Sequence, residues 1–188
     1  MNPYLSLAKQ AIENYIEKKT IISPTSDLPA DCLAKRAGTF VTIRQNEELK
    51  GCLGTYLPSQ ENIAKEIISN AVAAATQDYR FSPIKREDLP NLSYTVYILN
   101  EPELVRDTKE LDPKKYGVIV KAQVFSPSSD VIFNPSPTVE EKTGLLLPGL
   151  EGVDTPEQQI FIACQKGGID PTREKITIYR FGVEKHGQ

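Results

Sequence analysis

The sequence predicts a protein of mixed helices and β-strands, and three observations support this class. Residues 39–44 (TFVTIR) and 49–55 (LKGCLGT) are strand-like runs on either side of a polar break, a pattern typical of a β-hairpin. Apolar residues recur at helical spacing in residues 5–16, 63–74 and 160–164. Runs rich in β-branched and aromatic residues at 93–99 and 175–181 predict further strands.

Each predicted helix has a start signal of its own. Asn2 is a cap residue, and a proline follows it at the first helical position. We expect Ser59 to be the N-cap of the second helix. Thr155 begins the third with Gln158 as its capping-box partner, and Gly167 is placed to end it. These signals predict where each helix lies along the chain.

The composition is that of an ordinary globular protein. Of the 188 residues, 25% are charged and 39% hydrophobic, which suits one domain or two lobes that share a core. No apolar run is long enough to span a bilayer, and the first residues lack the pattern of a secretory signal, so we expect a cytoplasmic location. A net charge of −3 argues against duplex nucleic acid as the main partner. It does not exclude a local groove lined by basic residues.

The inventory of cysteine and histidine limits the metal chemistry. The cysteines Cys32, Cys52 and Cys164 are widely spaced, which resembles neither a disulfide framework nor paired zinc knuckles. The single histidine, His186, lies in what we expect to be a frayed tail. We therefore expect no metal and no cofactor, and we interpret Cys32 and Cys164 as structural residues.

Cys52 stands in the segment with the most potential chemistry. If residues 49–55 form the return strand of the hairpin, Leu49, Leu53 and Thr55 share one face, and Lys50, Cys52 and Gly54 share the other. We expect the two leucines to point into the core. Positions two apart on a strand lie roughly 6.5–7 Å apart, close enough for the Lys50 ammonium to favour a thiolate. The alternative is a small buried cysteine in a strand whose glycines mark a bulge or close packing.

These residues also resemble a known family. Residues 38–43 (GTFVTI), followed by 49–55, resemble the signature of the AMMECR domain family, whose hallmark reads Leu-Arg-Gly-Cys-Ile-Gly-Thr. Lys50 replaces the arginine, which keeps the charge but loses a bidentate fork. The resemblance continues through an alanine-rich helix and the run DYRF at 78–81 to YRF at 179–181, so it covers nearly the whole chain.

The resemblance implies an α+β architecture: a largely antiparallel sheet flanked by helices, a second smaller lobe, and a cleft near the cysteine motif. It implies one domain of two lobes over residues 1–188. Most relatives have a short hairpin where this chain carries a longer segment at about 122–142. We expect an elaborated hairpin there, and the alternatives are a tolerated surface loop, a lid and a partner-docking flap.

The resemblance also directs attention to particular residues. The candidate catalytic residues are Cys52, as nucleophile or redox thiol, and Lys50; the candidate binding residues are Gly51, Gly54, Thr55 and Arg80. Backbone N–H groups around Gly51 and Gly54 would stabilise a developing anion. Arg80 is either a structural anchor paired with Asp78 or an anion clamp. No general base is identifiable, so catalysis is left open.

Two functions from different classes remain. Prokaryotic relatives tend to occur with a Memo-type protein and a radical S-adenosylmethionine enzyme. This implies a subunit or accessory enzyme of that system, with a small molecule or peptide bound beside Cys52. The alternative is a non-catalytic module that binds protein or single-stranded nucleic acid through the Cys52 strand and the insert. That alternative predicts a buried, unreactive Cys52.

Overall fold

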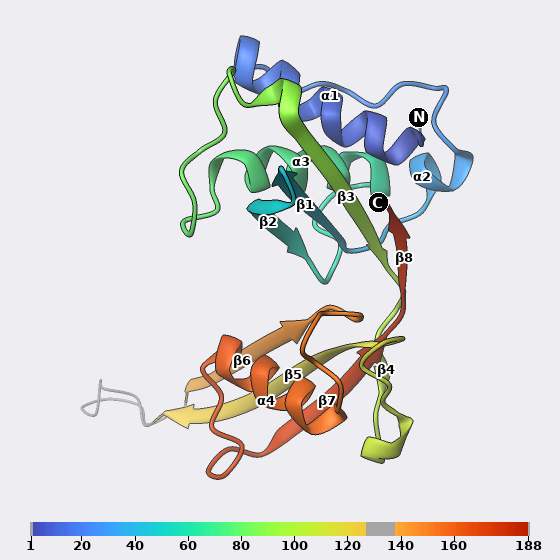
Figure 1. Cartoon of the computed structure of the whole chain (residues 1–188). Helices are drawn as coiled ribbons and strands as arrows, with labels where there is room; N and C mark the ends of the chain where they lie inside the picture. Colours follow the sequence, from blue (N-terminus) through green and yellow to red (C-terminus); the bar gives the residue numbers. More distant parts are fainter. Residues whose placement is uncertain (1, 127–137, 188) are drawn as a thin grey trace, which may run out of the picture. The chain divides into compact units, whose positions relative to one another are not determined.

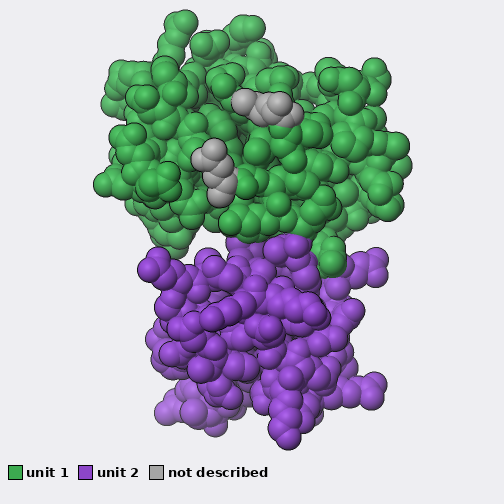
Figure 2. Space-filling view, turned by 45° about the vertical axis from the view of Figure 1, so that its right-hand side comes forward, with its two compact units in different colours: residues 1–100, 184–188 green, residues 101–183 purple. Residues whose placement is uncertain are grey.

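The computed structural model describes residues 2–126 and 138–187, and the chain divides into two compact units (Figure 2). Unit 1 comprises residues 1–100 and 184–188, and unit 2 comprises residues 101–183. Each unit has its own four-stranded sheet and its own apolar core. The α+β class is therefore confirmed. Within the described residues, no helix combines the length and the apolar character that crossing a membrane requires.

Unit 1 packs helices against one face of its sheet. Its elements are the helices α1 (Pro3–Lys18), α2 (Ala30–Ala34) and α3 (Ile63–Thr76), the short 3₁₀ turn η1 (Leu89–Asn91), and the strands β1 (Thr39–Gln45), β2 (Glu48–Thr55), β3 (Leu92–Leu99) and β8 (Val183–His186). The strand order is β2-β1-β3-β8 (Figure 1). Val41 and Ile43 of β1 are fully buried in one core with apolar side chains of α1 and α3. The opposite face of the sheet carries Thr42 and Cys52.

The predicted hairpin is present, and its turn is tighter than expected. Asn46 and Glu47 form a two-residue turn with φ of 50° and 68°, as a type I′ turn requires. The register then shifts between Ile43 and Arg44, because Lys50 is an extra residue that forms a β-bulge. The bulge reverses the alternation, so Leu49 lies opposite Arg44 and is 36% exposed. The expectation that Leu49 points into the core was wrong.

Two further boundaries differ from expectation. α3 begins after Asn62, whose side chain accepts the N–H of Lys65 at 2.9 Å, and Ser59 precedes the helix. The C-terminal residues form β8 instead of a frayed tail, and the His186 ring stacks on Tyr4 with 4.2 Å between centroids. The first difference is local, because Asn62 caps α3 three residues after Ser59, whereas the second arises from a partner far away in the sequence.

Unit 2 has the sheet order β4-β7-β5-β6, with one helix packed on β5 and β6. Its elements are β4 (Glu103–Leu104), the 3₁₀ turn η2 (Thr108–Glu110), β5 (Gly117–Ser126), β6 (Thr138–Leu146), α4 (Pro156–Gly167) and β7 (Ile176–Phe181). The capping box of Thr155 and Gln158 is confirmed. The helix ends at Gly167 as expected, and the left-handed C-cap is the next residue, Gly168, with φ of 61°.

The segment expected as an insert at about 122–142 is described only at its two ends. Residues 122–126 of β5 pair with residues 138–142 of β6 as antiparallel strands. Residues 127–137, on which the lid and docking-flap interpretations depend, lie outside the described residues. Those interpretations stay predictions.

Candidate functional site

Cys52 differs from the other two cysteines in its exposure. Cys32 and Cys164 are buried, as expected for structural residues, whereas Cys52 is partly exposed. Burial raises the pKa of the Cys32 thiol to about 11 and also raises that of Cys164. A protonated, buried thiol is unreactive. Cys52 is therefore the one cysteine of the three that a ligand in solvent can reach.

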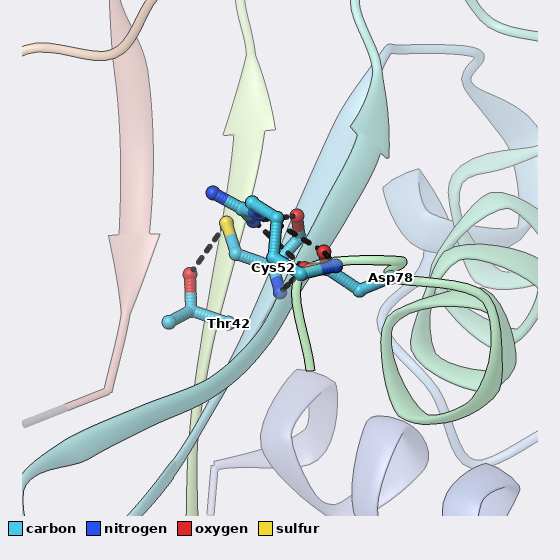
Figure 3. Close-up of polar contacts among 4 residues, drawn as sticks. Thr42, Cys52 and Asp78 are labelled. Carbon is cyan, nitrogen blue, oxygen red and sulfur yellow. Dashed lines mark hydrogen bonds and ion pairs between the residues drawn. The ribbon is translucent and has the colours of Figure 1, made fainter. Parts of the chain in front are cut away.

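The Cys52 side chain lies across from Thr42 of the neighbouring strand. The two residues are register partners in the β1–β2 ladder, and the Thr42 hydroxyl donates to Sγ at 3.2 Å (Figure 3). Thr42 itself is almost fully buried. A buried donor on a central strand cannot move far, so it fixes the sulfur position. Thr42 was not identified from the sequence, although a hairpin register places it directly opposite the cysteine.

The backbone of Cys52 is held by side chains from the loop after α3. The Cys52 N–H donates to Oδ2 of Asp78 at 2.8 Å, and Nη2 of Arg80 donates to the Cys52 carbonyl at 3.1 Å (Figure 3). β2 is an edge strand, and an unpaired edge normally exposes such backbone groups. The two side chains therefore take the place of a missing neighbouring strand at the position of the cysteine.

Asp78 and Arg80 also form an ion pair with each other, which holds both side chains beside the Cys52 backbone. Nε of Arg80 donates to Oδ1 at 2.9 Å and Nη2 to Oδ2 at 2.7 Å, while the Asp78 side chain is only 2% exposed. The hydrogen bond from Arg80 is the main cause that lowers the pKa of Asp78 to about 2. The same bond raises the pKa of Arg80. Arg80 thus makes the contacts of the structural anchor, one of the two roles expected for it.

Both glycines of the motif are sites of close backbone packing. A Cβ at Gly51 would collide with the carbonyl oxygen of Ala74 on α3. A Cβ at Gly54 would collide with Thr39 and Phe40 of β1. The space beside Gly54 is therefore filled by another backbone, which is the close packing expected as one meaning of these glycines. The glycines bring β2 close to its neighbours and so set the position of Cys52.

Thr55 belongs to a buried polar cluster at the end of β2. Its hydroxyl donates to Oε1 of Glu66 at 2.6 Å. Glu66 is fully buried on α3 and also accepts from the N–H and hydroxyl of Ser59 and from the N–H of Gln60. Asn70, one turn further, donates to Thr39 and Thr55. Glu66 and Asn70 were missed, although polar residues at core positions of a helical stripe are a readable signal.

No contact among the described residues places the Lys50 ammonium beside the Cys52 thiol. Its Nζ lies 3.2 Å from Oε2 of Glu48, and both side chains are solvent-accessible. The bulge at Lys50 also removes the regular two-residue spacing that would place it beside Cys52. Activation of the thiol by Lys50 stays a prediction.

Three cavities in the described part of the chain lie elsewhere. The largest has a volume of about 490 Å³ and is lined by residues of α1, β1, β3 and β8 with the hairpin turn; the others have about 260 and 290 Å³. None of the three is lined by Cys52. Among the described residues, no group of three or more His, Cys, Asp or Glu side chains is placed to hold a metal ion.

Comparisons with known proteins bear on the family and the fold. A Thermotoga maritima protein is 44% identical over 98% of this chain and 97% of its own length. A Clostridium acetobutylicum protein is 38% identical over 98% of the chain, but the chain spans only 36% of that protein. The crystal structure of the uncharacterised protein PH0010 from Pyrococcus horikoshii matches with a TM-score of 0.80 and 27% identity, covering 98% of this chain and 89% of that chain. The AMMECR1 family model matches residues 5–186, and the chain therefore belongs to the AMMECR1 family.

Proposed function

We propose that the protein binds a small molecule or peptide at Cys52 and reacts with it through the thiol. The observation that carries this proposal is the contrast between the partial exposure of Cys52 and its fixed backbone. Asp78 and Arg80 hold the N–H and carbonyl of Cys52, and Thr42 holds its sulfur. A structural cysteine needs no such frame, whereas a nucleophile must be held in one orientation to react.

The surroundings limit the chemistry that this thiol performs. Attack on an electrophilic carbonyl carbon forms a C–S bond while the C=O π bond breaks and its electron pair moves to the oxygen, and the thiol proton must leave. Asp78 is a poor acceptor for that proton, because its pKa of about 2 keeps it ionised and its oxygens are already engaged by Arg80 and Cys52. The proton therefore goes to water or to the substrate. This favours a substrate that is itself reactive, or a step in which a partner protein supplies the base.

One further backbone N–H faces the same edge of β2 as that of Cys52, because successive N–H groups along a strand point to opposite sides. The Cys52 N–H points away from β1, so the N–H of Gly54, two residues further, faces the same way. The Cys52 N–H itself is occupied by Asp78. We therefore assign Gly54 as the backbone group that would donate to a developing anion on the substrate.

We further propose that the protein works as a subunit or accessory enzyme beside a Memo-type protein and a radical S-adenosylmethionine enzyme. The family resemblance supports this partnership. We also propose a cytoplasmic location, which is consistent with three free cysteines and no disulfide among the described residues.

The test is a panel of chloroacetamide fragments of similar intrinsic reactivity, with labelling measured by intact mass and peptide mapping. We expect a few fragments to label Cys52 at least about a hundredfold faster than they label glutathione, because recognition raises the local concentration of the electrophile. Cys52→Ser is the control that must lose the signal. If every fragment reacts at its intrinsic rate, the thiol is accessible but no substrate site surrounds it.

A docking role has one specific observation in its favour. Tyr79, between Asp78 and Arg80, is 94% exposed, and tyrosines are enriched at protein interfaces. The docking model predicts that Tyr79→Ala abolishes capture of the Memo-type protein while Cys52→Ala retains it. The model is refuted if both variants capture that partner as well as the wild type does. The partial exposure of Cys52 already differs from the burial that this model predicted.

A further inference from the structure

The cavity of about 490 Å³ in unit 1 lies at the N-terminal end of β3. β8 has four residues and β3 has eight, so β8 cannot pair with all of β3. Figure 1 shows β8 beside the C-terminal half of β3. Residues 92–95, at the N-terminal end of β3, line the cavity. Gly187, which follows β8, packs against the Tyr94 carbonyl oxygen and Thr95, so among the described residues the edge beyond it is that of residues 92–93, whose backbone groups a ligand can meet.

Cationic side chains dominate the charge of this cavity. Lys9 of α1, Arg44 of β1 and Lys185 of β8 line it, against the single carboxylate of Glu47. Arg44 and Lys185 make no hydrogen bond or ion pair within the described chain. Lys9 has only a long ion pair, with 3.7 Å between its Nζ and Oε1 of Glu13 on α1. The whole protein has a net charge of −3, so this local excess of positive charge runs against the overall balance.

The remaining lining adds apolar surface. Leu5 and Leu92 contribute apolar surface. The hydroxyl of Tyr94 is fully buried and has no hydrogen-bond partner among the described residues. Burial raises the pKa of Tyr94, so the hydroxyl keeps its proton at neutral pH and remains a donor. Because this hydroxyl is fully buried, it adds no donor to the cavity surface, and the charged groups of the lining carry the polar recognition.

We propose that this cavity binds a small organic anion, a carboxylate or a phosphate ester with an apolar body. The volume lies in the range of small-molecule sites. Arg44 and Lys185 would bind the anionic group, while Leu5 and Leu92 contact the apolar body. An acidic peptide added along the β3 edge is the competing occupant.

This site is separate from the proposed chemistry at Cys52. Arg44 and Thr42 lie two residues apart on β1, and Cys52 lies opposite Thr42. Thr42, at 4% exposure, and its other register partner Thr95, at 3%, are buried between the cavity and the thiol. A ligand in the cavity therefore does not need the thiol, and either proposal can fail without the other.

The test titrates the full chain with phenyl phosphate, phenylacetate and inorganic phosphate, followed by amide NMR shifts, with benzyl alcohol as the uncharged probe. We expect the organic anions to shift the amides of residues 92–95. Arg44→Gln and Lys185→Gln should each weaken binding about tenfold, because a hydrogen bond to a charged group is lost. Lys85→Gln is the matched control, since Lys85 lies in the same unit outside the cavity and should leave affinity unchanged.

Comparison of the two aromatic anions tells a carboxylate ligand from a phosphate ligand. Cys52→Ser should bind phenyl phosphate as the wild type does. The proposal is overturned if no anion shifts these amides, if benzyl alcohol binds as tightly as the anions, or if Lys85→Gln weakens binding as much as Arg44→Gln. Binding of an acidic hexapeptide with no response to the small anions would also overturn it, and would assign the free edge to a peptide strand.

Discussion

Replacement of Asp78 by asparagine tests whether an ionised carboxylate holds the edge of β2. The Asp78 carboxylate accepts from the Cys52 N–H at 2.8 Å and from Arg80 at 2.7 and 2.9 Å, and its side chain is 2% exposed. Asparagine keeps the shape, but it has no charge and presents an NH₂ group where one carboxylate oxygen was. That group cannot accept from Arg80 or from the Cys52 N–H.

The magnitude follows from the pKa of Asp78. The difference between its ordinary value of 3.8 and about 2 in the folded protein, at about 1.4 kcal/mol per pH unit, gives about 2 kcal/mol. Because the folded pKa is the lower one, this stability is fully present above the unfolded pKa. It is lost as the pH falls from the unfolded pKa toward the folded one.

The assay is urea unfolding followed by circular dichroism at a series of pH values. At neutral pH we expect Asp78→Asn to lower the free energy of unfolding by about 2 kcal/mol. This difference should shrink as both proteins are taken toward a pH of about 2. The control is Glu48→Gln on the same strand, because its exposed carboxylate should contribute less than about 0.5 kcal/mol. A difference that stays constant across the pH series would refute the electrostatic explanation.

Two further substitutions test the supports of β2, both by urea unfolding at neutral pH. Gly51→Ala should cost about 2 kcal/mol, because the new Cβ meets the carbonyl oxygen of Ala74, whereas Lys50→Ala beside it should cost little; equal effects would contradict the close packing. Glu66→Gln should cost about 3 kcal/mol, since the amide nitrogen cannot accept from the donors that surround this buried carboxylate, and a loss below about 1 kcal/mol would show that the cluster contributes little.

Local signals predicted much of the fold. The hairpin was readable because β-branched runs flank a polar break, and the start of α4 was readable because Thr155 and Gln158 form a capping box. The bulge at Lys50 was not readable, since a polar break of four residues permits more than one register. β8 was also missed, because a short C-terminal strand depends on a distant partner, β3.

The candidate site was likewise predicted in part from the sequence and in part not. The motif directed attention to Cys52, and the hairpin register would also have identified Thr42 as its neighbour. The contact between Asp78 and the Cys52 N–H joins residues 26 apart, and no periodicity in the sequence predicts it. Lys50 illustrates the reverse error, because regular alternation placed it beside the thiol and the bulge removed that spacing.

The most direct test of the central claim is the rate at which iodoacetamide alkylates each cysteine, in the native protein and in denaturant, resolved by peptide mass spectrometry. The account predicts that Cys52 reacts in the native protein within about tenfold of its unfolded rate, since no local opening is needed to expose it. Cys32 and Cys164 should be slowed by about a thousandfold or more, because burial protects them. Equal protection of all three cysteines would contradict the account, since Cys52 would then be a packed structural residue like the other two.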